Sequence, residues 1–187
     1  MPTHLRRDSK NEIYFVTFAC YKWLPLIDLS HTYLYYKKWF RYLIVNHCEI
    51  LGYVIMPNHF HGLFFLKENS SLNLNKLIAN GKRFWAYEIV QQLEKLGEHK
   101  LLHFLQKEVS LKEIRIGKKH EIFQPSFDSK ICYSRKMLET KLDYIHRNPN
   151  QGKWHLAKTY VDYPYSSAAF YECQQTNSFI KHYMEII

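Results

Sequence analysis

Two neighbouring apolar segments limit the possible fold more than any other part of the chain. They cover residues 48–56 and 59–67, and only Pro57-Asn58 separates them. Proline and asparagine interrupt strands and favour turns. Each segment also has a length typical of β-strands. The pattern therefore predicts two consecutive strands that meet at a turn.

The second of these strands carries two histidines. His59 and His61 flank the apolar residue Phe60. Because alternate side chains of a strand point to the same face, both imidazoles share one face and Phe60 turns to the other. Two imidazoles on one face of a buried strand can clamp a divalent metal ion. A short His-x-His pattern also occurs by chance, so it is a weak signal when taken alone.

A helix further along the chain is the second informative feature. It is expected to begin near Ser134 and to end near Asn148, because Pro149 disfavours helical geometry in the residue before it. Apolar residues at helical spacing predict its core-facing stripe: Leu138, Leu142 and Ile145.

Two polar side chains of this helix lie one turn apart. Tyr144 and Asn148 are therefore neighbours at the rim of the apolar stripe, where a hydroxyl and an amide are presented together. The ordinary interpretation is a surface tyrosine followed by a helix-ending Asn-Pro pair. His146 falls on a different face of the helix from Tyr144, which makes it a poor candidate for a base that activates the tyrosine.

The remaining segments complete an α+β order. Residues 12–20 alternate like a strand, and Ser30 is a plausible N-cap for a helix that reaches His47. A second helix is expected from Ser71 or Asn73 to about Leu96, and a strand-like segment covers residues 121–132. The order is β-α-β-β-α-β-α, which predicts an α+β sandwich with a central antiparallel sheet.

Composition agrees with a folded protein that has an anionic partner. The 187 residues are 47% hydrophobic, and Lys and Arg exceed Asp and Glu to give a net charge of +9. Such an excess suits nucleic acid, although charge alone does not separate DNA from RNA. The aromatic fraction of 17% provides rings for the core and for stacking on unpaired bases.

The cysteines and the apolar segments indicate the cellular compartment in which we expect the protein. The four cysteines are far apart and form no Cys-x-x-Cys pair, which argues against a zinc ribbon or a redox motif: Cys20, Cys48, Cys132 and Cys173. Residues 1–7 are basic but lead into no apolar stretch, so we expect no signal peptide. No apolar run is long enough to span a membrane. We therefore expect a reduced, cytoplasmic protein.

Four segments, in this order and spacing, together resemble one protein family. They are Ile13–Phe18, Met56–His61, Asp143–Pro149 and Asp162–Ser167. Their pattern is similar to that of the single-tyrosine HUH transposases, in particular the REP-associated tyrosine transposases and their insertion-sequence relatives. The resemblance extends from about residue 12 to residue 172.

This resemblance implies a fold and a chemistry. The fold would be a ferredoxin-like sandwich, the core of HUH endonucleases. His59 and His61 would hold Mg²⁺ or Mn²⁺, with Asn148 as third ligand. Tyr144 would attack single-stranded DNA beside a hairpin and form a 5′-phosphotyrosine bond. Relatives include monomers and homodimers, and the sequence leaves that choice open.

One segment departs from the family pattern. We expect residues 1–187 to form a single transposase-like domain with a basic insertion at about 97–119 and a C-terminal tail after about 172. The insertion is either a solvated helix with a connecting strand or a DNA-contacting elaboration.

Three functions fit these observations. The first is an active transposase or nickase, and the second is a domesticated relative that binds a DNA or RNA hairpin without cutting it. The third is a ferredoxin-like RNA-binding module, but the chain lacks the glycine-aromatic signature of such sheets. A structural zinc site is disfavoured, because two histidines and one amide make a poor closed zinc site. The intact set favours the enzyme: His59, His61, Tyr144 and Asn148.

Overall fold

The computed structural model describes residues 9–187. The basic segment 1–7, which entered the argument on signal peptides, lies outside the described residues. Within the described part, none of the helices combines the length and the apolar character that a membrane span requires.

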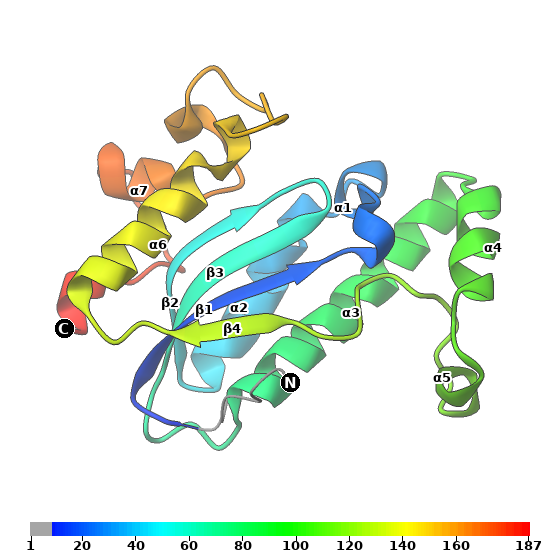
Figure 1. Cartoon of the computed structure of the whole chain (residues 1–187), viewed down its shortest axis with the longest axis horizontal. Coiled ribbons are helices and arrows are strands. Elements are labelled where there is room, and N and C mark those ends of the chain that lie inside the picture. Colours follow the sequence, from blue (N-terminus) through cyan, green and yellow to red (C-terminus); the bar gives the residue numbers. More distant parts are fainter. Residues whose placement is uncertain (1–8) are drawn as a thin grey trace.

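The centre of the molecule is a four-stranded antiparallel sheet with the strand order β2-β3-β1-β4 (Figure 1). The strands are β1 (Glu12–Ala19), β2 (Cys48–Ile55), β3 (His59–Leu66) and β4 (Asp128–Ile131). β2 and β3 form the predicted hairpin, closed by a hydrogen bond of 2.8 Å from the Met56 amide to the His59 carbonyl. The α+β sandwich with a central antiparallel sheet is therefore confirmed.

Helices cover the two faces of the sheet unequally (Figure 1). α2 (Tyr36–Val45) and α3 (Leu74–Lys95) pack on one face and enclose an aromatic core with Trp39 and Trp85. α6 (Arg135–Arg147) packs on the other face over a smaller, mostly aliphatic cluster. As predicted, the α6 residues that enter this cluster are Leu138, Leu142 and Ile145.

Local capping explains where the long helices begin. The side chain of Asn73 accepts a hydrogen bond of 2.9 Å from the Lys76 amide at the start of α3. Ser134 caps α6 in the same way through the Met137 amide. Both bonds satisfy amides that have no partner inside the helix, which is why these residue types mark helix starts. α6 ends at Arg147, and Pro149 lies in the 3₁₀ turn Asn148–Asn150 (η3) that follows.

Two predicted boundaries are wrong. The Ser30 hydroxyl donates back to the Leu26 carbonyl and so closes the short helix α1 (Leu26–Leu29), while α2 begins only at Tyr36, after the 3₁₀ turn Tyr33–Tyr35 (η2). The strand expected over residues 121–132 is ordered as a strand only in β4. Before β4, Phe123 forms an isolated bridge with Cys20, and the Gln124 amide donates to the Ala19 carbonyl at 2.9 Å.

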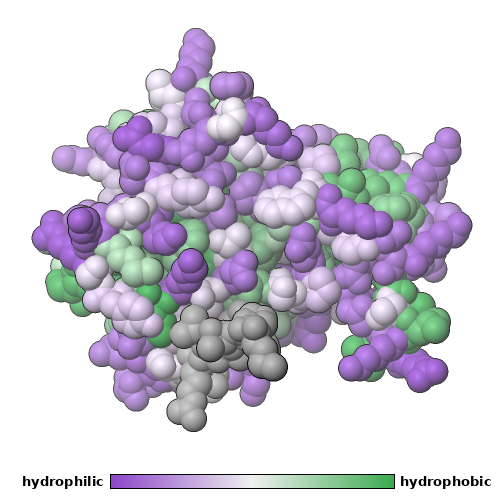
Figure 2. All heavy atoms as spheres, viewed as in Figure 1, coloured by the Kyte–Doolittle hydropathy of each residue, from purple (hydrophilic) through white to green (hydrophobic). Residues whose placement is uncertain are grey.

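The segment Gly97–Lys119 is helical throughout its regular part, with α4 (His99–Lys107) and α5 (Leu111–Arg115) and no connecting strand. It lies beyond the far end of α3, away from α6 (Figure 1). Its charged and apolar side chains are mixed on the outer surface, as Figure 2 shows on the side of α5.

The chain after α6 returns to the edge strand β2. It passes the 3₁₀ turn Tyr160–Asp162 (η4), pairs with β2 at Ser166 and forms α7 (Ala168–Glu172). The Ile55 amide donates to the Tyr165 carbonyl at 2.9 Å, and the Ser167 amide donates to the Tyr53 carbonyl at 2.9 Å. The edge of the sheet is thereby covered next to the end of α6. The last turn of the chain is the 3₁₀ turn Tyr183–Glu185 (η5).

Candidate active site

The two histidines of β3 lie on the face that α6 covers. Their ring centroids are 4.8 Å apart, and both residues are buried. Phe60 between them points to the opposite face and is fully buried in the aromatic core. The alternation predicted from the sequence is therefore present, and the strand itself fixes the spacing of the two imidazoles.

Each imidazole is oriented by a neighbour. His59 Nδ1 lies 2.6 Å from the amide oxygen of Asn58, whose amide nitrogen donates to the Trp23 carbonyl at 2.9 Å. His61 Nδ1 lies 2.7 Å from the hydroxyl of Thr17, directly across the β1–β3 pair. With both Nδ1 atoms engaged, the Nε2 atoms remain for another partner. This is the usual arrangement behind metal-binding histidines.

Burial keeps these rings uncharged. It lowers the pKa of His59 to about 4, an effect that a hydrogen bond with Asn148 partly opposes and the charge of Lys153 reinforces. It lowers the pKa of His61 to about 3, with further contributions from His59 and Lys141. Neutral imidazoles are the form that binds metal ions.

α6 brings the tyrosine to the same place. Tyr144 is 40% exposed, and its hydroxyl oxygen lies 3.5 Å from Nε2 of His61. Phe15 of β1 supports both rings, since it stacks on His61 at 5.6 Å and meets Tyr144 edge-on at 6.1 Å. The hydroxyl of a partly exposed tyrosine thus lies beside a buried histidine.

The fourth predicted residue, Asn148, lies at the beginning of η3 and is buried. Its side chain hydrogen-bonds with His59, whereas Tyr144 contacts His61. The structure therefore brings together all four residues singled out in the sequence, in two neighbouring contacts.

Close packing fixes the position of α6 on the sheet. A Cβ atom at Gly52 of β2 would lie 2.5 Å from Leu142 Cδ1, so a larger residue would require the leucine side chain or the helix to shift. One turn further on, His146 Nε2 lies 2.8 Å from the Ser167 hydroxyl, which also accepts from the Tyr53 amide at 2.9 Å. His146 is buried in this contact and faces away from Tyr144. It therefore joins α6 to the covered edge of the sheet.

A lysine adds positive charge on the open side of the tyrosine. The ammonium of Lys141 lies 4.7 Å from the ring centroid of Phe15 and 5.9 Å from that of Tyr144. It is half-buried, and its charge contributes to the lowered pKa of His61. An anion that reached the tyrosine hydroxyl would come close to this ammonium.

The donor set suits a hard or borderline divalent ion. Among residues 9–187, no group of three or more His, Cys, Asp or Glu side chains is gathered for metal binding. The family resemblance of the sequence implies the amide oxygen of Asn148 as the third protein ligand. Two imidazoles and one amide oxygen leave open positions, which fits a metal that binds substrate better than a closed structural site.

Several residues of the site escaped sequence reasoning. Thr17, Asn58 and Phe15 contact the histidines only because of the strand register and the turn. Thr17 is a polar residue in a mostly apolar strand, which is a signal once its partner strand is known. Ser167 carries no such signal, since its role depends on the return of the chain to β2.

Comparison with known proteins identifies the fold. Neither a protein-family model nor a curated protein sequence matches the chain. Among solved structures, a REP-associated tyrosine transposase bound to a REP hairpin superposes with a TM-score of 0.56 at 20% sequence identity. The superposition covers 89% of this chain and 82% of that chain. The chain has the fold of a tyrosine transposase. The family resemblance of the sequence is thus confirmed at the level of the fold.

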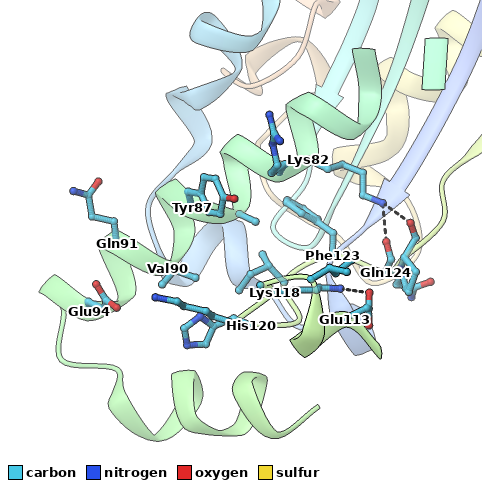
Figure 3. Close-up of a pocket in the computed structure, with 17 residues that line it drawn as sticks. Lys82, Tyr87, Val90, Gln91, Glu94, Glu113, Lys118, His120, Phe123 and Gln124 are labelled. Atoms are coloured by element: carbon cyan, nitrogen blue, oxygen red, sulfur yellow. Dashed lines mark hydrogen bonds and ion pairs between the residues drawn. The ribbon is translucent and has the colours of Figure 1, made fainter. Parts of the chain in front are cut away.

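A separate hollow of about 770 Å³ lies between α3 and residues 113–125 (Figure 3). Its wall includes Lys118, which pairs with Glu113 at 2.8 Å, and Lys82, which donates to the carbonyl of Gln124 at 2.7 Å. α3 packs on the sheet face opposite α6, and none of the four candidate residues lines this hollow. Its size therefore says nothing about the tyrosine site.

Proposed function

We propose that this protein cleaves and rejoins single-stranded DNA beside hairpins, with Tyr144 as the nucleophile. The observation that carries the proposal is the contact of 3.5 Å between the Tyr144 hydroxyl and His61 Nε2, with His59 beside it. A tyrosine with only a surface role would not require contact with a buried pair of neutral imidazoles.

The proposed site binds a divalent ion through His59, His61 and the amide oxygen of Asn148. When bound, Mg²⁺ or Mn²⁺ would supply positive charge that neutralises the phosphate and stabilises the departing 3′ oxygen. The chain contributes the orientation of both imidazoles through Asn58 and Thr17. Preorganised ligands need no rearrangement when the substrate arrives.

The reaction is a transfer of a phosphoryl group to tyrosine and back. The Tyr144 hydroxyl loses its proton to solvent, which reaches this partly exposed side chain. Its oxygen then bonds to phosphorus while the bond from phosphorus to the 3′ oxygen breaks. The departing 3′ oxygen takes up a proton from solvent, which gives a 5′-phosphotyrosine and a free 3′-OH. Attack by a 3′-OH of another strand reverses these steps and joins DNA without ATP.

Lys141 and Phe15 assist by position. The ammonium of Lys141, 5.9 Å from the tyrosine ring centroid, would attract a bound phosphate. Phe15 supports the rings of Tyr144 and His61, and so keeps the nucleophile in line with the site. Correct placement of reacting groups accounts for a large part of many rate enhancements.

Two facts support hairpin-bearing DNA as the partner. The solved transposase with the same fold is bound to a REP hairpin. The present chain carries a net charge of +9, which suits a polyanion. The alternative function is a domesticated protein that binds a DNA or RNA hairpin without cutting it, and the same experiment separates the two.

The test is a denaturing gel of the protein with labelled single-stranded oligonucleotides from both flanks of its own gene. Reactions contain Mg²⁺, Mn²⁺ or chelator. We expect a metal-dependent protein–DNA adduct that Tyr144→Phe abolishes. Tyr133→Phe is the matched control, since Tyr133 is a 76% exposed tyrosine just before α6. Binding without an adduct in every metal would replace the proposal by the non-cleaving alternative.

A further inference from the structure

Two tryptophans flank the candidate metal site on the His59 side. Trp23 meets the His59 ring edge-on with 5.5 Å between ring centroids, and Trp154 lies 6.4 Å from the same ring. Trp23 is 55% exposed and Trp154 is half-buried. The other two tryptophans of the chain, Trp39 and Trp85, are buried in the core on the opposite face.

The exposure of Trp23 is maintained against a backbone cost. Lys22 and Trp23 both have left-handed φ angles, of 48° and 58°. Residues other than glycine rarely adopt this conformation, because it is strained. A strained turn that presents a large apolar ring to solvent beside a candidate site suggests a ligand for that ring.

Two hydrogen-bonded contacts hold this turn. Asn58 donates to the Trp23 carbonyl at 2.9 Å, and the same side chain orients His59. From the insertion, Glu108 accepts from Lys22 at 2.7 Å and also from the hydroxyl of Tyr21. The turn is therefore coupled to the histidine on one side and braced by the end of α4 on the other.

Trp154 reaches the same histidine from a different element. It lies on the loop after η3, so it follows Asn148 closely in the chain. The ammonium of Lys153 lies over its ring at 5.1 Å. Beyond Trp154 is a hollow of about 520 Å³ with Tyr165 and Pro57 in its wall. Aromatic faces with an adjacent cation are the usual features of a surface that binds single-stranded nucleic acid.

We propose that Trp23 and Trp154 stack on unpaired bases of the DNA strand whose phosphate occupies the tyrosine site. This inference rests on the proposed function, because that function places the strand beside His59. Stacking tolerates every base, so the two rings would hold the strand in place and leave sequence recognition to other contacts. The insertion would contribute indirectly, through the support that Glu108 gives to the turn.

Tryptophan fluorescence tests the stacking without cleavage. The experiment uses Tyr144→Phe protein in chelator, with a single-stranded oligonucleotide and the duplex of the same sequence. We expect the single strand to quench the exposed tryptophans and the duplex to quench far less. In the double variant Trp23→Leu/Trp154→Leu, only buried tryptophans remain, and the quenching should be lost. Equal quenching by single strand and duplex would overturn the proposal.

Affinity gives the second measurement. Trp23→Ala should weaken single-strand binding by roughly 5-fold to 100-fold, the range typical of one stacked base, and Trp23→Phe should restore most of it. Tyr87→Ala is the matched control, since Tyr87 is 62% exposed on the opposite side of the sheet, and it should bind like the parent. Glu108→Gln should have a smaller effect that disappears when Trp23 is already alanine. Unchanged binding by Trp23→Ala and Trp154→Ala would contradict the proposal.

Abasic substitutions locate the contact. Single abasic sites are placed at each position around the cut, and binding is compared between parent and Trp23→Ala. A position that matters only when Trp23 is present identifies the stacked base, because coupled changes are not additive. Purely additive losses at every position would overturn the direct contact.

A last comparison separates this inference from the proposed function. Binding and adduct formation are both measured for Trp23→Ala in protein that retains Tyr144. Wild-type binding and wild-type adduct would refute the stacking and leave the cleavage standing. If quenching depends on Trp23 but the wild-type protein forms no adduct in any metal, the cleavage is refuted and the stacking is supported.

Discussion

The two faces of the sheet differ in what they bury. The face under α2 and α3 holds interlocking aromatic rings, including Phe18, Trp39 and Phe60. The face under α6 holds a smaller aliphatic cluster and every buried histidine of residues 9–187: His59, His61 and His146. β3 supplies both faces, since Phe60 lies between the two histidines of the site. Strand alternation thus separates residues that stabilise the fold from residues of the candidate site.

Acid should affect the α6 face first and with the largest effect. Burial lowers the pKa of His59 and of His146 to about 4 and that of His61 to about 3, whereas each is near 6.5 in an unfolded chain. Between about pH 6.5 and 4 the unfolded state therefore binds more protons, so the free energy of unfolding falls as the pH falls. The loss is on the order of 2 to 3 kcal/mol for each histidine by pH 4.

Urea unfolding at several pH values, in chelator, measures this loss. His146→Gln should flatten the profile, whereas His103→Gln, at an exposed histidine, should leave it unchanged. A midpoint that stays constant from pH 7 to pH 4 would contradict buried neutral histidines on this face.

Removal of Phe60 should give the next largest effect, this time from the aromatic face. Phe60 is fully buried and stacks on Phe18 at 5.1 Å. Phe60→Ala should lower the free energy of unfolding by about 3 to 5 kcal/mol, because it leaves a cavity in a packed core. Thermal unfolding by circular dichroism measures this change. Tyr144→Phe, on the other face, should leave the melting temperature nearly unchanged, and similar losses in both variants would refute the separation of the two faces.

A smaller change tests how α6 is seated. Gly52→Ala places a methyl group 2.5 Å from Leu142 Cδ1, so the leucine or the helix must shift. We expect a loss of about 1 to 3 kcal/mol, the usual range for overpacking. Where the helix shifts, adduct formation should fall by more than the loss of folded protein explains, because Tyr144 lies on that helix.

The double variant Gly52→Ala/Leu142→Ala separates the clash from other effects of the substitution. It should form more adduct than Gly52→Ala alone, and equal activity of the two variants would show that the helix is seated by other contacts.

The sequence predicts the strand and the helix that carry the site, but not the contacts that support its residues. Strand alternation places His59 and His61 on one face, and helical spacing places Tyr144 beside Asn148, both of which are local properties. The family resemblance then implies their roles. Asn58 is adjacent to His59, yet its contact depends on the shape of the turn and on the Trp23 carbonyl.

The wrong boundary at Ser30 has a similar cause. Its residue type predicts a helix start, but Leu26 and Ile27 pack in the core and a short helix ends there. Contacts between segments distant in sequence, such as His146 with Ser167, leave no periodic signal.

The smallest expected effect concerns that last contact. Ser167→Ala removes the hydroxyl that joins His146 to the Tyr53 amide, at 2.8 and 2.9 Å. Because the buried imidazole is left without its hydrogen-bond partner, we expect the free energy of unfolding to fall by about 1 kcal/mol. Ser167→Thr should restore the hydrogen bond if the added methyl group fits.

Urea unfolding measures the loss of stability in Ser167→Ala, and the adduct assay reports whether α6 has moved. A stability loss with unchanged adduct formation would show that packing at Gly52 alone holds Tyr144 in position, whereas a parallel loss would assign part of that positioning to His146.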